Sequence, residues 1–253
     1  MLASWRLWRQ VAGGSTLRQA RRQVTAADGF RGAARVDRPF GVALLGLEEM
    51  PTEPFGWNVI VIGAWNMAIL TPDGVRRRLF QVEDGIPLEV QIAVDSPGQF
   101  RVAHDGILVA PTATRLELAP QKPEPESLAR AAELACRALH SLPETPVSAA
   151  GVNIRFRFAE LPDKLLDLVR AQVDGSLADA GFKIAGATTK RTLAHDPGVI
   201  NLQVKQEDVG GTLEFNCHRD SKTHGELSEW IRRVPEFVEV STTLLKVLGI
   251  ADA

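Results

Sequence analysis

A repeated order of elements, marked by two similar short motifs, is the feature that most constrains the fold of this chain. The motif AHDG contains His104 and the motif AHDPG contains His195, and each falls where a hairpin turn is predicted. The two histidines lie 91 residues apart, as do Trp57 and Ser148 near the first predicted strand of each half. The spacing indicates an internal duplication. The alternative is convergence of two unrelated hairpins on a common turn sequence.

In the first half, the order is strand, helix, antiparallel strands, helix. The apolar run 57–70 predicts a central strand with a bulge at Gly63, and Thr71 is expected to cap a short helix that follows. The segment LEVQIAV at 88–94 alternates with period two, which predicts a half-buried strand before the AHDG hairpin. A helix is predicted over 125–142, where apolar residues form a stripe.

The second half repeats this order. The segment GVNIRFRF at 151–158 alternates strictly and predicts a strand. Pro162 begins a predicted helix whose apolar stripe extends to Leu177, and Gly181 is expected as its left-handed C-cap. A last helix runs to the C-terminus, with a kink or restart at Pro235. Between these helices, strands are predicted near 183–193, 199–206 and 211–218.

The predicted fold class is therefore α+β, with two tandem units at 40–145 and 146–253. They follow a basic, flexible tail at 1–39. Residues 1–38 carry eight arginines and two aspartates, a net charge of +6, whereas the remainder carries 21 basic and 29 acidic residues, a net charge of −8. The tail has three interpretations: an extension without a role, an arm that contacts phosphates or anionic lipid, or an organelle transit peptide.

Composition predicts a globular protein. Apolar residues make up 45% of the chain and charged residues 24%, which is ordinary for a protein with a sizeable core. No apolar run reaches the roughly 18 residues that indicate a membrane-spanning helix. Cys136 and Cys217 are too few for a disulfide framework, so free buried thiols in a reducing compartment are expected.

The segment EFNCHRDSKTHGE at 214–226 is the densest cluster of reactive side chains. Alternation places Cys217 toward the core and His218 away from it, so the two are poor joint ligands. Thr223 and Glu226 predict a capping box at the start of the last helix. We therefore expect a strand end and a capped helix rather than a metal site. A metal-dependent hydrolase, the least favoured hypothesis, would use His218, Asp220 and His224.

No catalytic motif supports an enzyme. The sequence has no G-x-S-x-G, no phosphate-binding loop, no H-E-x-x-H and no G-x-G-x-x-G. His104 and His195, each followed by an aspartate, lie in turns that need aspartate and glycine for backbone reasons. No catalytic residue, metal or cofactor is predicted, and we expect a protein that is not an enzyme.

One surface suggests a function. In the second half, the strand residues opposite the core are mostly amides and cations. Such side chains can grip a polar or anionic partner, although solvation of an open antiparallel sheet gives the same pattern. The candidate binding residues are Asn153, Arg155, Arg157, Asn201, Gln203, Lys205, Asn216 and His218.

Three functions follow in order of preference. The first is a non-enzymatic binding or assembly protein, whose partner is a protein or a second copy docking on this face or at the junction of the two units. The second is a nucleic-acid-binding protein that uses residues 1–38 and the sheet arginines. The acidic remainder of the chain argues against it, because nonspecific affinity comes from phosphate neutralisation. The third is the metal-dependent hydrolase.

The layout of TPVSAAGVNIRFRF, the later strand and FNCHRD before a final amphipathic helix resembles an uncharacterised bacterial protein family of sporadic distribution. The resemblance covers mainly residues 57–250 and implies a bacterial cytoplasmic origin. It transfers no activity and no residue role. The repeated strand–helix–strands–helix order is also similar to that of TATA-binding-protein-like domains. That similarity concerns topology alone, and fold does not determine function.

Overall fold

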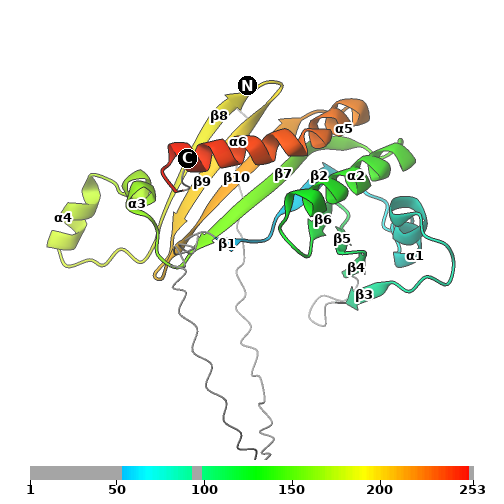
Figure 1. Ribbon diagram of the computed structural model, residues 1–253, viewed down its shortest axis with the longest axis horizontal. Coiled ribbons are helices and arrows are strands. Elements are labelled where there is room, and N and C mark those ends of the chain that lie inside the picture. Colours follow the sequence, from blue (N-terminus) through cyan, green and yellow to red (C-terminus); the bar gives the residue numbers. More distant parts are fainter. Residues whose placement is uncertain (1–52, 93–98, 251–253) are drawn as a thin grey trace, which may run out of the picture. The chain divides into compact units, whose positions relative to one another are not determined.

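The computed structural model describes residues 53–92 and 99–250, and these residues form one antiparallel sheet with helices packed against one of its faces (Figure 1). The predicted tail at 1–39 lies outside the described residues. The first half contains β1 (Glu53–Pro54), β2 (Asn58–Gly63), α1 (Pro72–Val75), the π-helical turn η1 (Arg76–Phe80), β3 (Glu89–Ile92), β4 (Phe100–His104), β5 (Ile107–Pro111), β6 (Arg115–Pro120) and α2 (Pro125–Ser141). The second half contains β7 (Val147–Phe158), α3 (Asp163–Val169), α4 (Val173–Asp179), β8 (Ala187–His195), β9 (Gly198–Gln206), β10 (Gly211–Asp220), α5 (His224–Arg232) and α6 (Val234–Val247).

The strand order is mirrored about the centre of the sheet. It reads β3-β4-β5-β6-β2-β7-β10-β9-β8, and β1 pairs with the far end of β7. Outward from β2 come β6, β5 and β4, and outward from β7 come β10, β9 and β8. The first long strand of each half, β2 or β7, therefore lies at the centre, and the α+β class is confirmed. The two expected units share this sheet through the pairing of β2 with β7.

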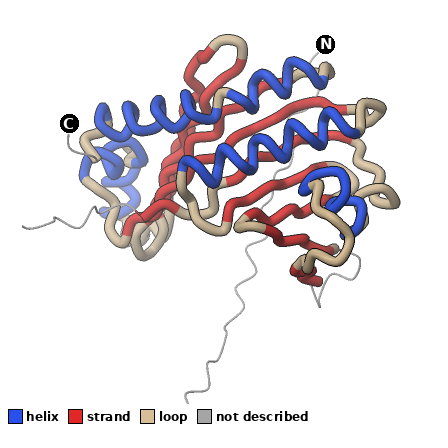
Figure 2. The backbone as a smooth tube through the Cα atoms, turned by 45° about the vertical axis from the view of Figure 1, so that its right-hand side comes forward, coloured by secondary structure: helices blue, strands red, loops and turns tan. Residues whose placement is uncertain are grey.

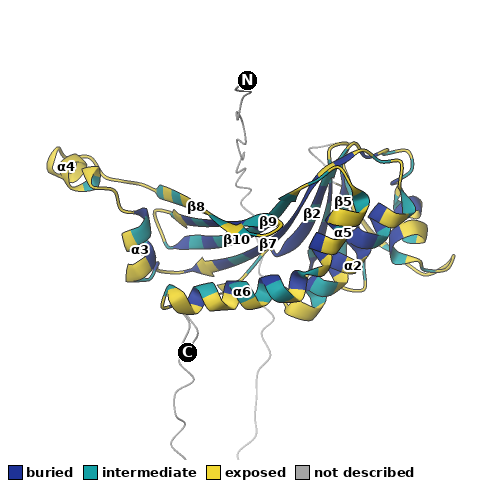
Figure 3. Cartoon of the chain, turned by 90° about the horizontal axis from the view of Figure 1, so that it is seen from above, coloured by how far each residue is buried: buried dark blue, intermediate teal, exposed yellow. Residues whose placement is uncertain are grey.

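The core lies between the sheet and its helices. Helices α2, α5 and α6 run across the same face of the sheet (Figure 2). Val59 and Val152 are paired neighbours on β2 and β7, and both are fully buried, as is Phe215 on β10. Trp230 of α5 and Phe237 of α6 pack on each other with ring centroids 4.7 Å apart. Figure 3 shows the buried side of the strands facing these helices.

Several local predictions are confirmed because short-range chemistry determines them. Thr71 caps α1: its Oγ1 accepts a hydrogen bond of 3.1 Å from the backbone N–H of Gly74. The pairing of β2 with β7 shifts register at Gly63, where a bulge was predicted. The β4–β5 turn holds Asp105 at φ 49° and Gly106 at φ 76°, and Gly181 has φ 85°.

Three element predictions are wrong in part. The first strand ends at Gly63 rather than near residue 70. All four residues of β3 are exposed rather than half-buried, because β3 is the outermost strand on its side. The helix after Pro162 breaks at Arg170, whose backbone is extended, so α3 and α4 are separate and the expected stripe residue Leu177 is exposed.

Over the described ranges, no helix combines the length and apolarity needed to cross a membrane.

Candidate binding face

The strand register brings all the predicted binding residues onto one face of the sheet, opposite the packed helices. On β7, β10 and β9, Asn153 stands beside Asn216, which stands beside Asn201. No described helix covers this side of these strands (Figure 3). We call this surface the polar face. Its members are Asn153, Arg155, Arg157, Asn201, Gln203, Lys205, Asn216 and His218, joined by Glu214 and by Thr188, Lys190 and Thr192 of β8.

A row of asparagine side chains crosses the polar face and continues onto β2. We call Asn201, Asn216, Asn153 and Asn58 the amide row. Each Nδ2 donates to the Oδ1 of the next residue in that order, at 3.0, 2.6 and 2.6 Å. Thr192 Oγ1 donates to the Oδ1 of Asn201 at one end, and Asn58 Nδ2 donates to Glu117 Oε1 at the other. The hydrogen bonds thus run in one direction across six strands.

The amide row combines burial with unused bonding capacity. Asn58 and Asn153 are 5% and 3% exposed, so they act as its buried anchor. Asn201 and Asn216 are half-buried. An amide offers two N–H donors and an oxygen with two lone pairs, and the row uses one donor and one acceptor site of each of these two residues. The remaining groups can meet a partner, and their side chains are already fixed.

A charged row lies beside the amide row. Arg155 is held on two sides: its Nε donates to Glu214 Oε2 at 3.0 Å, and its NH1 donates to the carbonyl oxygen of Gly56 at 2.6 Å. In the strand register, Glu214 is followed by Gln203 on β9 and Lys190 on β8. Lys190 is exposed, and Gln203 is half-buried. This row presents a carboxylate, an amide and a cation within a few strand spacings.

The third row carries two further cations that already have neighbours. The Arg157 guanidinium lies 4.5 Å from the centre of the Phe55 ring. Lys205 Nζ lies 2.5 Å from Glu207 Oε1. Together with Arg155, these residues show that most cations of the polar face contact other groups of the protein.

His218 lies at the margin of the polar face. Its Nε2 is 3.0 Å from Asp220 Oδ1, and its side chain is partly exposed. Gly151 stands opposite it on β7, and a Cβ on that glycine would lie 3.1 Å from Asn216 Nδ2. The missing side chain therefore leaves room for Asn216 of the amide row.

The three residues of the metal-site alternative do not converge. His218 and Asp220 are neighbours, but His224 lines a groove between α2 and α5 on the helical side. Nowhere in 53–92 or 99–250 do three potential metal-ligating side chains form a cluster. The alternation that separated Cys217 from His218 is confirmed: Cys217 is fully buried, and its burial raises the thiol pKa to about 12.

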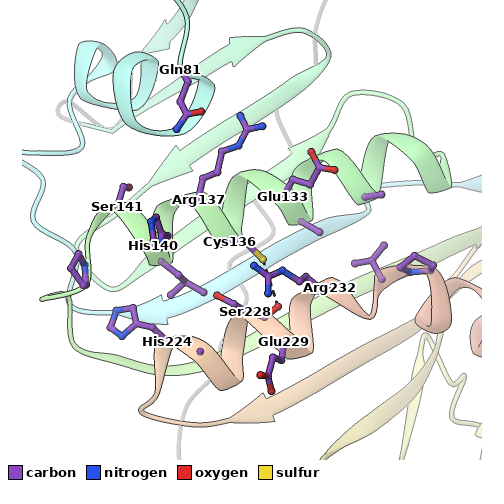
Figure 4. A pocket seen from close by; sticks show the side chains of 17 residues that line it. Gln81, Glu133, Cys136, Arg137, His140, Ser141, His224, Ser228, Glu229 and Arg232 are labelled. Carbon is purple, nitrogen blue, oxygen red and sulfur yellow. Dashed lines mark hydrogen bonds between the residues drawn. The ribbon is translucent and has the colours of Figure 1, made fainter.

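The groove between α2 and α5 is a feature that the sequence did not indicate, because it depends on how two distant helices pack. It encloses about 800 Å³, and its charged side chains are balanced, with Glu133 and Arg137 on α2 and Glu229 and Arg232 on α5 (Figure 4). Cys136 lines it, with Sγ 3.6 Å from the carbonyl oxygen of Ser228, and burial raises the pKa of this thiol. A protonated thiol is a poor nucleophile, so the groove holds no activated cysteine.

In both hairpin motifs, residues of the turn contact an arginine from a helical segment. Asp105, in the first turn, pairs with Arg130 of α2. In the second, Arg233 donates to the carbonyl oxygen of Asp196 at 2.9 Å and lies 3.1 Å from His195 Nε2. In each half, an arginine from the helical segment that follows therefore secures the hairpin.

The capping box predicted for α5 is wrong in its side-chain partners. Thr223 occupies the N-cap position, but its side chain makes no capping hydrogen bond. Glu226 instead accepts from Ser221 Oγ at 2.9 Å and from Arg219 at 2.6 Å, and Ser221 Oγ also accepts from the Thr223 N–H. These two donors lower the pKa of Glu226. Ser221 lies two residues before the N-cap, whereas the capping-box pattern considers only the N-cap residue and the residue three positions after it.

No protein-family model matches the sequence, and no curated protein matches it.

Proposed function

We propose that this chain is a non-enzymatic binding or assembly protein, whose protein partner docks on the polar face. The observation that carries the proposal is the amide row. A solvated sheet face needs only separate polar side chains, whereas here one hydrogen-bonded chain links six strands. Groups held in this way lose little conformational freedom when a partner arrives.

The chemistry of the face favours a protein over a nucleic acid. Arg155, Arg157 and Lys205 each contact a carboxylate or an aromatic ring of the chain itself. Nucleic-acid affinity depends on cations that are free to neutralise phosphates. A polar protein surface instead suits mixed donors, acceptors and charges of both signs.

The mirrored strand order supports the internal duplication, which we include in the proposal. An offset of 91 residues carries β4 onto residues 191–195, within β8, and carries β5 onto residues 198–202, within β9. In this interpretation, the polar face is a specialisation of the second copy.

Photo-crosslinking tests the proposal. A benzoyl-phenylalanine replaces Gln203 on the polar face or, in the control, the exposed Thr242 of α6, in the full chain expressed in its native cells. We expect a discrete crosslinked protein from position 203 and none from position 242. A nuclease-sensitive adduct at position 203 would favour the nucleic-acid alternative. Crosslinking from position 242 alone would contradict the proposal.

A further inference from the structure

The outer edge of β8 is a long strand edge without a strand partner in the described part of the chain. Within that part, β8 pairs only with β9, along nine residues. The opposite edge strand, β3, has four residues. The outward N–H and C=O groups of an edge strand can pair with any extended chain that reaches them, and proteins commonly use such edges to bind peptides.

The side chains of this edge are basic on both sides of the sheet. Lys190 stands beside Gln203 on the polar face, and Arg191, the next residue, points to the other side because successive strand residues alternate. Both side chains are exposed, and β8 contains no acidic residue. Arg191 bonds only within its own strand, at 2.8 Å to Thr189 Oγ1 and 3.2 Å to the Lys190 carbonyl oxygen. Neither cation forms an ion pair with any residue that the structure describes.

We propose that the β8 edge binds an extended acidic segment of a partner protein, which becomes the next strand of the sheet. Its backbone pairs with the outward groups of β8. Two adjacent carboxylates of the segment point to opposite faces, so one meets Lys190 and the other meets Arg191.

The charge of the edge distinguishes this partner from a second copy. Antiparallel pairing of two β8 strands about their midpoint would place Arg191 opposite Arg191. Like charges directly opposite each other destabilise a strand pair. An acidic segment instead neutralises both cations. This inference shares Lys190 with the proposed docking on the polar face, but it otherwise uses the backbone of β8 and Arg191, which points to the opposite side.

A synthetic peptide tests the edge. The probe is a fluorescein-labelled ten-residue peptide of threonine and valine with two adjacent central glutamates, titrated with the full chain at low salt and followed by fluorescence anisotropy. We expect Lys190→Glu with Arg191→Glu to weaken binding about tenfold or more. The matched control, Lys222→Glu with Lys246→Glu, makes the same charge change at exposed sites and should alter affinity by less than about twofold. Lys190→Gln with Arg191→Gln should give an intermediate loss, and circular dichroism checks that each variant is folded.

A second peptide separates strand addition from simple charge attraction. Prolines at alternate positions keep the two glutamates but remove the N–H groups that a strand must donate. We expect this peptide not to bind, and we expect the first peptide to slow amide exchange within 187–195. Equal binding of the proline peptide, or unchanged binding by the Lys190/Arg191 variants, would overturn the inference. Self-association of the chain that is lost in those variants would assign the edge to a second copy instead and would also overturn it.

Discussion

The two halves of the sheet face away from the helices share a strand order but differ in chemistry. On the second half, this face carries the amide row and the charged rows of β7 to β10. On the first half, it carries an aliphatic patch of the half-buried Ile60, Ile62 and Leu108, beside the charged Arg115 and Glu117 of β6. The amide row crosses between the halves at Asn58 and Glu117, whereas Ile60 of β2 stands beside Gly151 of β7. The mirrored topology therefore does not determine what the face can bind; its side chains do.

The largest expected change in stability follows from a substitution of Asn153, in the buried anchor of the amide row. Asn153→Ala removes both the acceptor of Asn216 Nδ2 and the donor to Asn58 Oδ1, in a buried setting. Each unsatisfied group costs about 1–3 kcal/mol, so the free energy of unfolding should fall by about 3 kcal/mol in urea titration. Gln203→Ala on the same face should change it by less than about 0.5 kcal/mol. Equal effects of the two variants would show that the row has no structural role.

The aliphatic patch of the first half should respond to loss of volume rather than loss of hydrogen bonds. Ile60→Ala removes methyl and methylene groups from a half-buried site, and we expect unfolding to become easier by about 1–2 kcal/mol. Thermal unfolding measures this as a fall of a few degrees in Tm. A change smaller than that of Gln203→Ala would mean that this half is solvated like the polar half, and the comparison would fail.

The Arg155–Glu214 pair should be weaker than the amide row, because both side chains are partly exposed. A double-mutant cycle with Arg155→Leu and Glu214→Gln should give a coupling of about 0.5–1 kcal/mol, which decreases in high salt. Coupling that is larger than the Asn153→Ala effect and insensitive to salt would make this pair, rather than the amides, the anchor of the face.

Effects of about 1 kcal/mol or less are expected at the start of α5, just beyond the polar face. Ser221→Ala breaks the hydrogen bonds to Glu226 and from the Thr223 N–H and should cost about 1 kcal/mol, whereas Thr223→Ala should cost less than about 0.5 kcal/mol. Denaturant unfolding of the two variants compares them directly. The opposite order would restore the capping box that the sequence suggested.

The sequence predicted the polar face because alternation is a local signal. Period two along β7 and β10 places Asn153 and Asn216 opposite the core whatever the partner strands are. It did not predict the amide row, which depends on the register of strands far apart in the chain and includes Asn58 from the other half. The only sequence signal for Asn58 was its position as a polar residue between the apolar Trp57 and Val59.

The partial failures have the same origin. The 88–94 segment alternates as a half-buried strand does, but a position at the edge of the sheet leaves Glu89–Ile92 exposed. Glu226 has the spacing of a capping box, but its carboxylate accepts hydrogen bonds from Ser221 and Arg219 instead. In each case the local pattern was present, and tertiary placement decided the outcome.

Side-chain footprinting of the full chain, alone and with its crosslinked partner, tests the central claim most directly. Hydroxyl radicals modify side chains that are at least partly exposed, so His218 and Arg157 report on the polar face while Ile62 and Leu108 report on the aliphatic patch of the first half. The account predicts that the partner protects His218 and Arg157 and leaves Ile62 and Leu108 unchanged. Protection of Ile62 and Leu108 with no change at His218 and Arg157 would contradict it.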